Sequence, residues 1–239
     1  KQARAGYSKE GGRRDPAGGA RPVAGTVTAK TGSAFVTQEE IGQAAGMLAA
    51  SRTMGGRFNR FPDQCRPTDP AQGYAIQDAL HERLGGGIAG YKIGCTTPVM
   101  QKYLGIDHPC AGGIFDGSVH ASPATLNYRD FRRVGVECEI AVRLGRDLPA
   151  GPFTRNSVAE AVGECMAAIE LVDDRYVDYT QLDAASMIAD DFFGAGCVLG
   201  EPRRDWQSLD LAACAAIMTV NGKSAGRGTG ALVLGHPME

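Results

Sequence analysis

Residues 133–144 read RVGVECEIAVRL, and every second residue from Val134 to Leu144 is apolar. Alternation with a period of two is typical of a β-strand whose apolar side chains share one face. The positions between them include Glu137 and Glu139, whose side chains leave the opposite face together, with Cα atoms roughly 6.6–7 Å apart. The stretch therefore predicts a long strand that carries two neighbouring carboxylates.

Helices and strands mix around this stretch without a regular βαβ alternation. Capping signals at Thr37 and Asp69 predict the starts of two helices, and Gly55 and Gly85 predict their ends. Further strands are predicted over 88–94, 167–172, 195–199 and 217–220, the last before the hairpin dipeptide Asn221-Gly222, and further helices over 97–104 and from Asn156 or Ser157. The pattern predicts an α+β fold with a largely antiparallel or mixed sheet.

The first 34 residues differ in composition from the rest. Residues 1–30 hold seven Lys and Arg against two acids, a balance of +5, while the remainder has a balance of −7. We expect a disordered basic tail over 1–34 and one domain over 35–239. The alternative for the tail is a basic arm that contacts nucleic acid or a membrane. The acidic domain itself argues against a nucleic-acid partner and favours cation binding.

The cysteines and the apolar runs indicate the compartment. The seven cysteines are scattered, and no C-x-x-C pair occurs. This pattern favours reduced thiols in a cytoplasm over a disulfide framework or a zinc ribbon. No apolar run approaches the length of a membrane span, and no secretory leader is visible at the N-terminus. We expect a soluble cytoplasmic protein with no membrane partner.

Three carboxylates form the candidate metal site. Two ionised carboxylates on neighbouring positions of one strand repel each other, and a hard divalent cation between them relieves the repulsion. Oxygen-only ligation favours Mg²⁺ or Mn²⁺. The alternative is that Glu137 and Glu139 simply form the wet face of the strand. Glu170 lies within AAIELV, an apolar run in which a carboxylate must be paired, protonated or bound to metal. Its alternative is an ion pair with an arginine such as Arg175.

Three further residues are candidates for catalysis. Lys92 lies in the apolar strand GYKIG, where a lysine either reaches solvent or is held near anions. Asp116 follows a glycine-rich segment, and its alternative is an ordinary turn aspartate. Asp190 precedes Asp191 and two phenylalanines, and this pair is a candidate for site acids or for a helix or turn cap.

Five runs of the sequence stand out together: GYKIGCTTPVMQKYLGID (90–107), GVECEIAVRLGRDLP (135–149), AAIELVDDRY (167–176), IADDFFGAGCVLG (188–200) and NGKSAGRGTGALVLGHP (221–237). As a set they resemble a known family, the 2-keto-4-pentenoate hydratases of the fumarylacetoacetate hydrolase superfamily. The resemblance covers about residues 36–237, in order and with matching spacing. It implies a mixed β-roll of the fumarylacetoacetate hydrolase C-terminal-domain type with flanking helices. Members continue beyond the G-H-P segment, so the resemblance implies that the domain is truncated at its C-terminus.

The resemblance also implies site residues. The family's E-x-E pair matches Glu137 and Glu139, its third acidic ligand matches Glu170, and Mg²⁺ or Mn²⁺ is the implied ion. The family's active-site lysine matches Lys92, while a family aspartate maps only loosely to Asp116. The family's A-D-N segment reads Ala189-Asp190-Asp191 here, so Asp191 departs from the usual asparagine.

The implied reaction is hydration of 2-hydroxypenta-2,4-dienoate or a homologue to a 4-hydroxy-2-oxo acid, in the breakdown of aromatic compounds. Lys92 would supply positive charge or help proton transfer, with Asp116 or Asp190 moving protons or positioning water. One alternative is decarboxylation of a 2-oxo-3-enedioate at the same site. Another is a non-catalytic assembly subunit. The implied partners are a small 2-oxo or 2-hydroxydienoic acid, further copies of the chain in a homo-oligomer, and a related decarboxylase.

Overall fold

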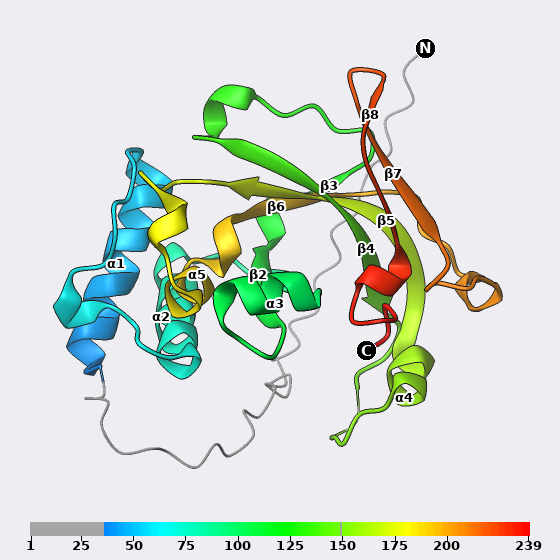
Figure 1. The fold of residues 1–239 in the computed structure, drawn as a ribbon, viewed down its shortest axis with the longest axis horizontal. Helices are drawn as coiled ribbons and strands as arrows, with labels where there is room; N and C mark the ends of the chain where they lie inside the picture. Colours follow the sequence, from blue (N-terminus) through cyan, green and yellow to red (C-terminus); the bar gives the residue numbers. More distant parts are fainter. Residues whose placement is uncertain (1–35, 149) are drawn as a thin grey trace, which may run out of the picture. The chain divides into compact units, whose positions relative to one another are not determined.

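The computed structural model describes residues 36–148 and 150–239, and these contain both helices and strands (Figure 1). The predicted tail, residues 1–34, lies outside the described residues. The helices are α1 (Gln38–Met54), α2 (Pro70–Leu84), α3 (Pro98–Leu104), α4 (Arg155–Ala161) and α5 (Ala184–Ala189). The strands are β1 (Ile88–Gly94), β2 (Cys110–Phe115), β3 (Val119–Ala121), β4 (Val134–Leu144), β5 (Val162–Asp173), β6 (Gly194–Leu199), β7 (Ala215–Val220) and β8 (Lys223–Thr229).

The central sheet has four strands in the order β3-β6-β5-β4. The long strand predicted from its alternation is β4, which pairs antiparallel with β5 along its whole length. β6 also pairs antiparallel with β5, whereas β3 and β6 are parallel. Mixed pairing together with the helices confirms the predicted α+β class.

Two antiparallel strand pairs complete the strand content. β1 pairs with β2, so that Lys92 lies opposite Gly112. β7 and β8 form the predicted hairpin around Asn221 and Gly222. Both turn residues have a positive φ, 50° and 77°, as the favoured two-residue hairpin turns require.

The main apolar core lies among α1, α2 and α5. Thr37 caps α1 in the predicted capping box with Glu40, and Asp69 caps α2 with Pro70 at its first position. The capped helices bring one apolar stripe each to the core. Its fully or almost fully buried side chains include Ile41, Ala44, Ala45, Leu48, Ile76, Leu80, Ile188, Phe61 and Tyr176. A smaller core around Trp206 includes Val162 and Cys165, which lie at the start of β5.

The segment before Glu170 differs from the prediction. The helix begins at Arg155 with Thr154 as its N-cap, and Ser157 supplies the third-position partner of that capping box. The helix therefore begins one residue before the earlier of the two predicted starts, Asn156 and Ser157. The helix ends at Ala161, and β5 begins at Val162, five residues before the predicted strand. The apolar residues Val162 and Cys165 fit either period, and pairing with β4 decides in favour of the strand.

One face of the β4–β5 pair is apolar and partly exposed. Val136, Val142 and Leu144 of β4 and Ile169 of β5 are each 41–48% exposed. The register brings Cys138 opposite Ile169, so these side chains share one face, away from Glu137 and Glu139. The alternation correctly predicted an apolar face, but the described residues leave that face only half covered.

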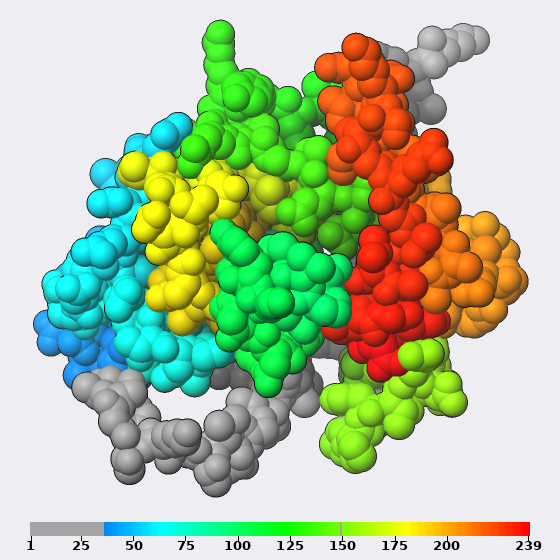
Figure 2. All heavy atoms as spheres, viewed as in Figure 1, coloured from blue at the N-terminus to red at the C-terminus, as the bar shows by residue number. Residues whose placement is uncertain are grey.

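The surface around α3 adjoins the C-terminal segment. Figure 2 shows these two segments side by side, and the amide nitrogen of Leu234 donates to the carbonyl oxygen of Thr96 at 3.3 Å. Among the described residues, no helix is long and apolar enough to cross a membrane.

Close packing between α2 and α5 gives a stability prediction. A Cβ added at Gly73 would lie 2.6 Å from the carbonyl oxygen of Ala185 and 3.1 Å from Ile188, whereas one added at Gly42 would meet nothing within 4 Å. We expect Gly73→Ala to lower the free energy of unfolding by about 1–3 kcal/mol, because α5 must shift. The matched change Gly42→Ala is expected to raise it by up to about 1 kcal/mol through helix propensity. Urea titrations measure both, and equal effects would contradict the packing argument.

Candidate metal centre

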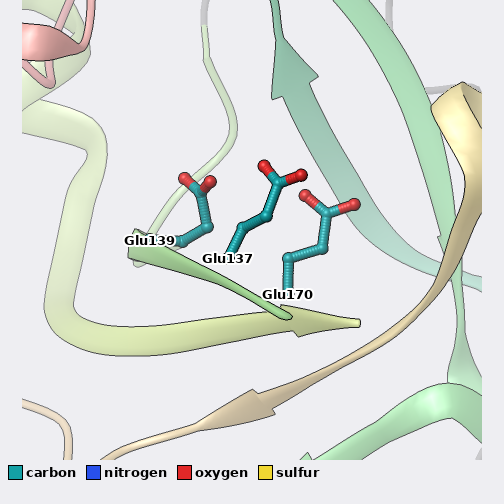
Figure 3. Close-up of side chains that lie close together, drawn as sticks. All are labelled: Glu137, Glu139 and Glu170. Atoms are coloured by element: carbon teal, nitrogen blue, oxygen red, sulfur yellow. The ribbon is translucent and has the colours of Figure 1, made fainter. Parts of the chain in front are cut away.

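Three glutamates meet on one face of the β4–β5 pair. Glu137 lies directly opposite Glu170 across the two strands, and Glu139 follows two positions along β4. Each offers a carboxylate oxygen, and these oxygens all lie within 4.8 Å of one another. Figure 3 shows the three side chains leaving the strands on the same side with their carboxylates together. The sequence prediction that these residues converge is confirmed as geometry.

The electrostatics of this cluster call for a positive charge. Glu170 is only 9% exposed, and burial raises its pKa while the nearby Lys92 opposes that rise. Burial, Glu170 and Glu137 together raise the pKa of Glu139 to about 7. Three carboxylates this close cannot all ionise without compensation. Because every donor in the cluster is a carboxylate oxygen, the cluster fits a divalent cation that prefers oxygen ligands.

Lys92 reaches the cluster from β1. Its ammonium group makes an ion pair with Glu170 and donates to the carbonyl oxygen of Phe192 at 3.0 Å. The alternative in which Glu170 pairs with Arg175 is wrong, since Arg175 pairs with Asp190 instead. The ammonium has three donors. Contacts with the described residues use two of them, so the third N–H is left for a ligand.

The carbonyl that Lys92 contacts belongs to an unusual turn. Asp191, Phe192 and Phe193 have φ values of 51°, 47° and 64°, which is the left-handed region that ordinary residues avoid. A non-glycine residue there costs about 1–3 kcal/mol and persists only when its surroundings hold it. The turn connects α5 to β6, and it directs the Phe192 carbonyl toward Lys92.

A buried ion cluster holds this turn. Arg52, in the last turn of α1, donates to Oδ1 of Asp190 at 3.0 and 2.8 Å and to its carbonyl oxygen at 2.8 Å. Arg175, which follows β5, donates to Oδ2 of Asp190 at 3.1 Å. Burial alone would raise the pKa of Asp190, but Arg175 and Arg52 keep it below its ordinary value. These contacts give Asp190 a structural role, and its predicted role in proton transfer stays a prediction.

Asp191 extends the ion cluster to α2 and β2. Its Oδ1 lies 2.8 Å from Nε2 of His81 and accepts from the amide nitrogen of Gly113 at 2.8 Å. Its Oδ2 lies 3.2 Å from the guanidinium group of Arg52. The side chain of Asp191 is fully buried, and Asp190 occupies the position between α5 and the turn 191–193 without a side-chain capping hydrogen bond. The cap interpretation therefore holds for the position of Asp190 but not for the contacts of either side chain.

Asp116 is not a member of the glutamate cluster. It is exposed and lines a pocket of about 460 Å³ together with Gly87, Phe115 and Arg175. Neither Lys92 nor the three glutamates line this pocket. The catalytic role predicted for Asp116 stays a prediction.

Sequence reasoning missed Arg52, His81 and the Phe192 carbonyl. The signal that could have pointed to them is the pair Asp190-Asp191 beside apolar residues, because two adjacent buried carboxylates need cations. No spacing in the sequence says which cations these are, since Arg52 is 138 residues away from Asp190.

Comparisons of the sequence place it near curated enzymes. The 2-keto-4-pentenoate hydratase of Burkholderia vietnamiensis is 33% identical over 201 residues, covering 83% of this chain and 76% of that protein. That of Paraburkholderia phymatum is 34% identical over 179 residues, covering 74% and 68%. The 2-hydroxyhexa-2,4-dienoate hydratase of Comamonas testosteroni is 32% identical over 203 residues, covering 80% and 73%. No family model matches the sequence.

A comparison of folds agrees. The 4-oxalocrotonate decarboxylase of Pseudomonas putida G7, solved with magnesium and adipate, superposes with a TM-score of 0.80. It is 22% identical, and the match covers 86% of this chain and 79% of that one. At this identity the match shows a shared fold, as the resemblance to the fumarylacetoacetate hydrolase superfamily implied.

The ion cluster gives a second stability prediction. We expect Asp190→Asn to lower the free energy of unfolding by roughly 3–5 kcal/mol, because it leaves two buried guanidinium groups undercompensated. The folded-state pKa of Asp190 lies below the unfolded value, so its contribution is complete above about pH 3.9 and is lost only as the pH falls through the folded-state pKa. The loss should therefore be constant from about pH 5 to 8 in urea titrations.

The control for this experiment is Asp147→Asn, because Asp147 is exposed. We expect this variant to stay within about 0.5 kcal/mol of the unchanged protein. A loss at Asp190→Asn no larger than that of the control would contradict the structural role of the cluster.

Proposed function

The chain belongs to the 2-keto-4-pentenoate hydratase family of the fumarylacetoacetate hydrolase superfamily, and we propose that it is a carbon–oxygen lyase that adds water to 2-hydroxypenta-2,4-dienoate or a homologue. The product is a 4-hydroxy-2-oxo acid. The observation that carries this proposal is the convergence of three glutamates from β4 and β5 with one ammonium group from β1. The domain that does this is the one predicted over residues 35–239.

We propose Glu137, Glu139 and Glu170 as the ligands of the ion, and Mg²⁺ or Mn²⁺ as its identity. Their oxygen donors and their mutual repulsion support this choice. When bound, such an ion supplies Lewis acidity toward oxygen atoms of the substrate. Charge balance supports the same assignment, because the single positive charge of Lys92 can offset only one of the three carboxylates.

Lys92 is the proposed catalytic residue. Its ammonium is fixed at two points, by Glu170 and by the Phe192 carbonyl, and its remaining N–H can donate to the carboxylate or the 2-oxygen of the substrate. A donor held in place where negative charge increases during reaction stabilises the transition state more than a mobile one. The left-handed turn supports this function, because it fixes the acceptor that orients the ammonium. Asp116 and Asp190 remain secondary proposals for moving protons.

The assignment as a hydratase is favoured over decarboxylation. The relatives that share 32–34% identity carry hydratase names, whereas the decarboxylase resembles the chain at 22% identity and supports the fold alone. We also propose that the enzyme acts in the breakdown of aromatic compounds and that it assembles as a homo-oligomer, with a related decarboxylase as a further partner.

The first test of this proposal is turnover. We expect the purified chain with Mg²⁺ to remove the ultraviolet absorbance of 2-hydroxypenta-2,4-dienoate and to yield 4-hydroxy-2-oxopentanoate. Lys92→Met should lower kcat/KM by roughly 10²–10⁴-fold while Mn²⁺ still binds, because the lysine donates to the substrate and its loss frees Glu170. Lys102→Met, at an exposed lysine of α3, is the matched control. Release of CO₂ from a 2-oxo-3-enedioate without hydration would instead support the decarboxylase.

The second test is metal binding. Glu139→Gln should weaken Mn²⁺ binding by more than roughly tenfold. Loss of a residue that only hydrogen-bonds to a metal ligand already costs about that much, and loss of a ligand should cost more. The exposed Glu160, changed to Gln, is the control. Because the pKa of Glu139 is raised to about 7, protons compete with the ion below that pH. The apparent affinity of the unchanged protein should therefore fall about tenfold per pH unit below 7, and Glu139→Gln should lose this slope. Equal affinities and slopes would remove Glu139 from the ligand set.

A further inference from the structure

We propose that Cys95 and Cys110 form an oxidisable dithiol site that closes to an intramolecular disulfide when hydrogen peroxide reaches it. The two residues lie at the adjacent ends of β1 and β2, where Gly94 is directly opposite Cys110. Both thiols are free in the structure. The inference does not depend on the proposed hydratase activity.

Backbone geometry directs the two thiols toward each other. In a regular strand the side chain after Gly94 would leave the face opposite to that of Cys110. Cys95 instead has a φ of 57°, in the left-handed region, which ends the strand regularity and reorients its side chain. Cys95 directly follows the residue paired with Cys110, and both side chains pack in the same apolar core, so the two thiols are neighbours. A hydrogen-bond interaction between them shifts their pKa values in opposite directions. Neighbouring thiols react with each other more readily than with a second molecule.

The two cysteines differ in access and in acidity. Cys95 is partly exposed, whereas Cys110 is 1% exposed within the main core. The hydrogen bond from Cys110 and, further, the ammonium of Lys92 lower the pKa of Cys95. The same hydrogen bond, together with burial, raises the pKa of Cys110. A thiolate is the form that reacts with oxidants, so Cys95 is the residue that is oxidised first.

The reaction balances in two steps. The Cys95 thiolate attacks one oxygen of hydrogen peroxide, so that an S–O bond forms, the O–O bond breaks and hydroxide leaves to become water. The Cys110 sulfur then attacks the sulfenic sulfur of Cys95. An S–S bond forms, the S–O bond breaks, and the second water leaves with the proton of Cys110. Two thiols lose two electrons, and one peroxide is reduced to two waters.

The first step prepares the second. Part of what raises the pKa of Cys110 is the negative charge of Cys95. Conversion of the thiolate to the neutral sulfenic acid removes this charge and eases the loss of the Cys110 proton. Burial of Cys110 keeps external thiols and bulky disulfides away from the resolving sulfur.

The test is peptide mapping after brief exposure of the reduced protein to stoichiometric peroxide. Trypsin cleaves after Lys92, Lys102 and Arg129, so Cys95 and Cys110 fall in separate peptides, 93–102 and 103–129. We expect these two peptides to appear crosslinked when free thiols are alkylated and the digest is not reduced. Absence of this crosslink while the exposed Cys138 is oxidised would overturn the proposal.

Two variants make the assignment specific. In Cys95→Ser, the free thiol of Cys110 should disappear at least about tenfold more slowly, because no sulfenic acid forms beside it for its sulfur to attack. In Cys138→Ser, the crosslink should form as in the unchanged protein. Oxidation of Cys110 at the same rate in Cys95→Ser would show that it reacts alone, and would also overturn the proposal.

Discussion

Two adjacent aspartates that have no access to solvent impose the main constraint on this fold. Asp190 and Asp191 must be compensated where they are buried, and their partners come from three separate places, Arg52 in α1, the His81 imidazole in α2 and Arg175 after β5. Because an uncompensated buried charge costs several kcal/mol, the helices and the central sheet are restricted to arrangements that bring these groups together. The left-handed turn after α5 is retained for the same reason.

The candidate centre and this cluster differ in how their charges are balanced. Around Asp190 and Asp191, each buried carboxylate contacts at least one guanidinium group, so the cluster is a structural element. On the face of β4 and β5, three carboxylates face one ammonium, and the pKa of Glu139 rises to about 7. Unbalanced charge in a partly open position is typical of a site that binds a ligand. The Phe192 carbonyl joins the two, since it belongs to the turn and contacts Lys92.

Local rules in the sequence account for much of the fold and for the core of the site. Period-two alternation predicted β4, and with it the shared face of Glu137 and Glu139, because strand geometry fixes both. The start of β5 was predicted five residues too late, since short apolar runs fit helix and strand equally well. The partners of Asp190 were beyond prediction, because nothing local to an aspartate says which distant arginine will meet it.

The length of chain between Arg52 and Asp190 has a consequence for the way the protein folds. The contact spans 138 residues, so it can form only after α1 and the turn before β6 have been brought together from distant parts of the chain. Contacts of such high sequence separation form slowly, since a large loop must close before they contribute any stability. The second anchor of Lys92, the Phe192 carbonyl, also lies 100 residues away, whereas Glu137 and Glu170 belong to paired neighbouring strands. Orientation of the ammonium group therefore depends on longer loop closure than assembly of the acidic cluster does.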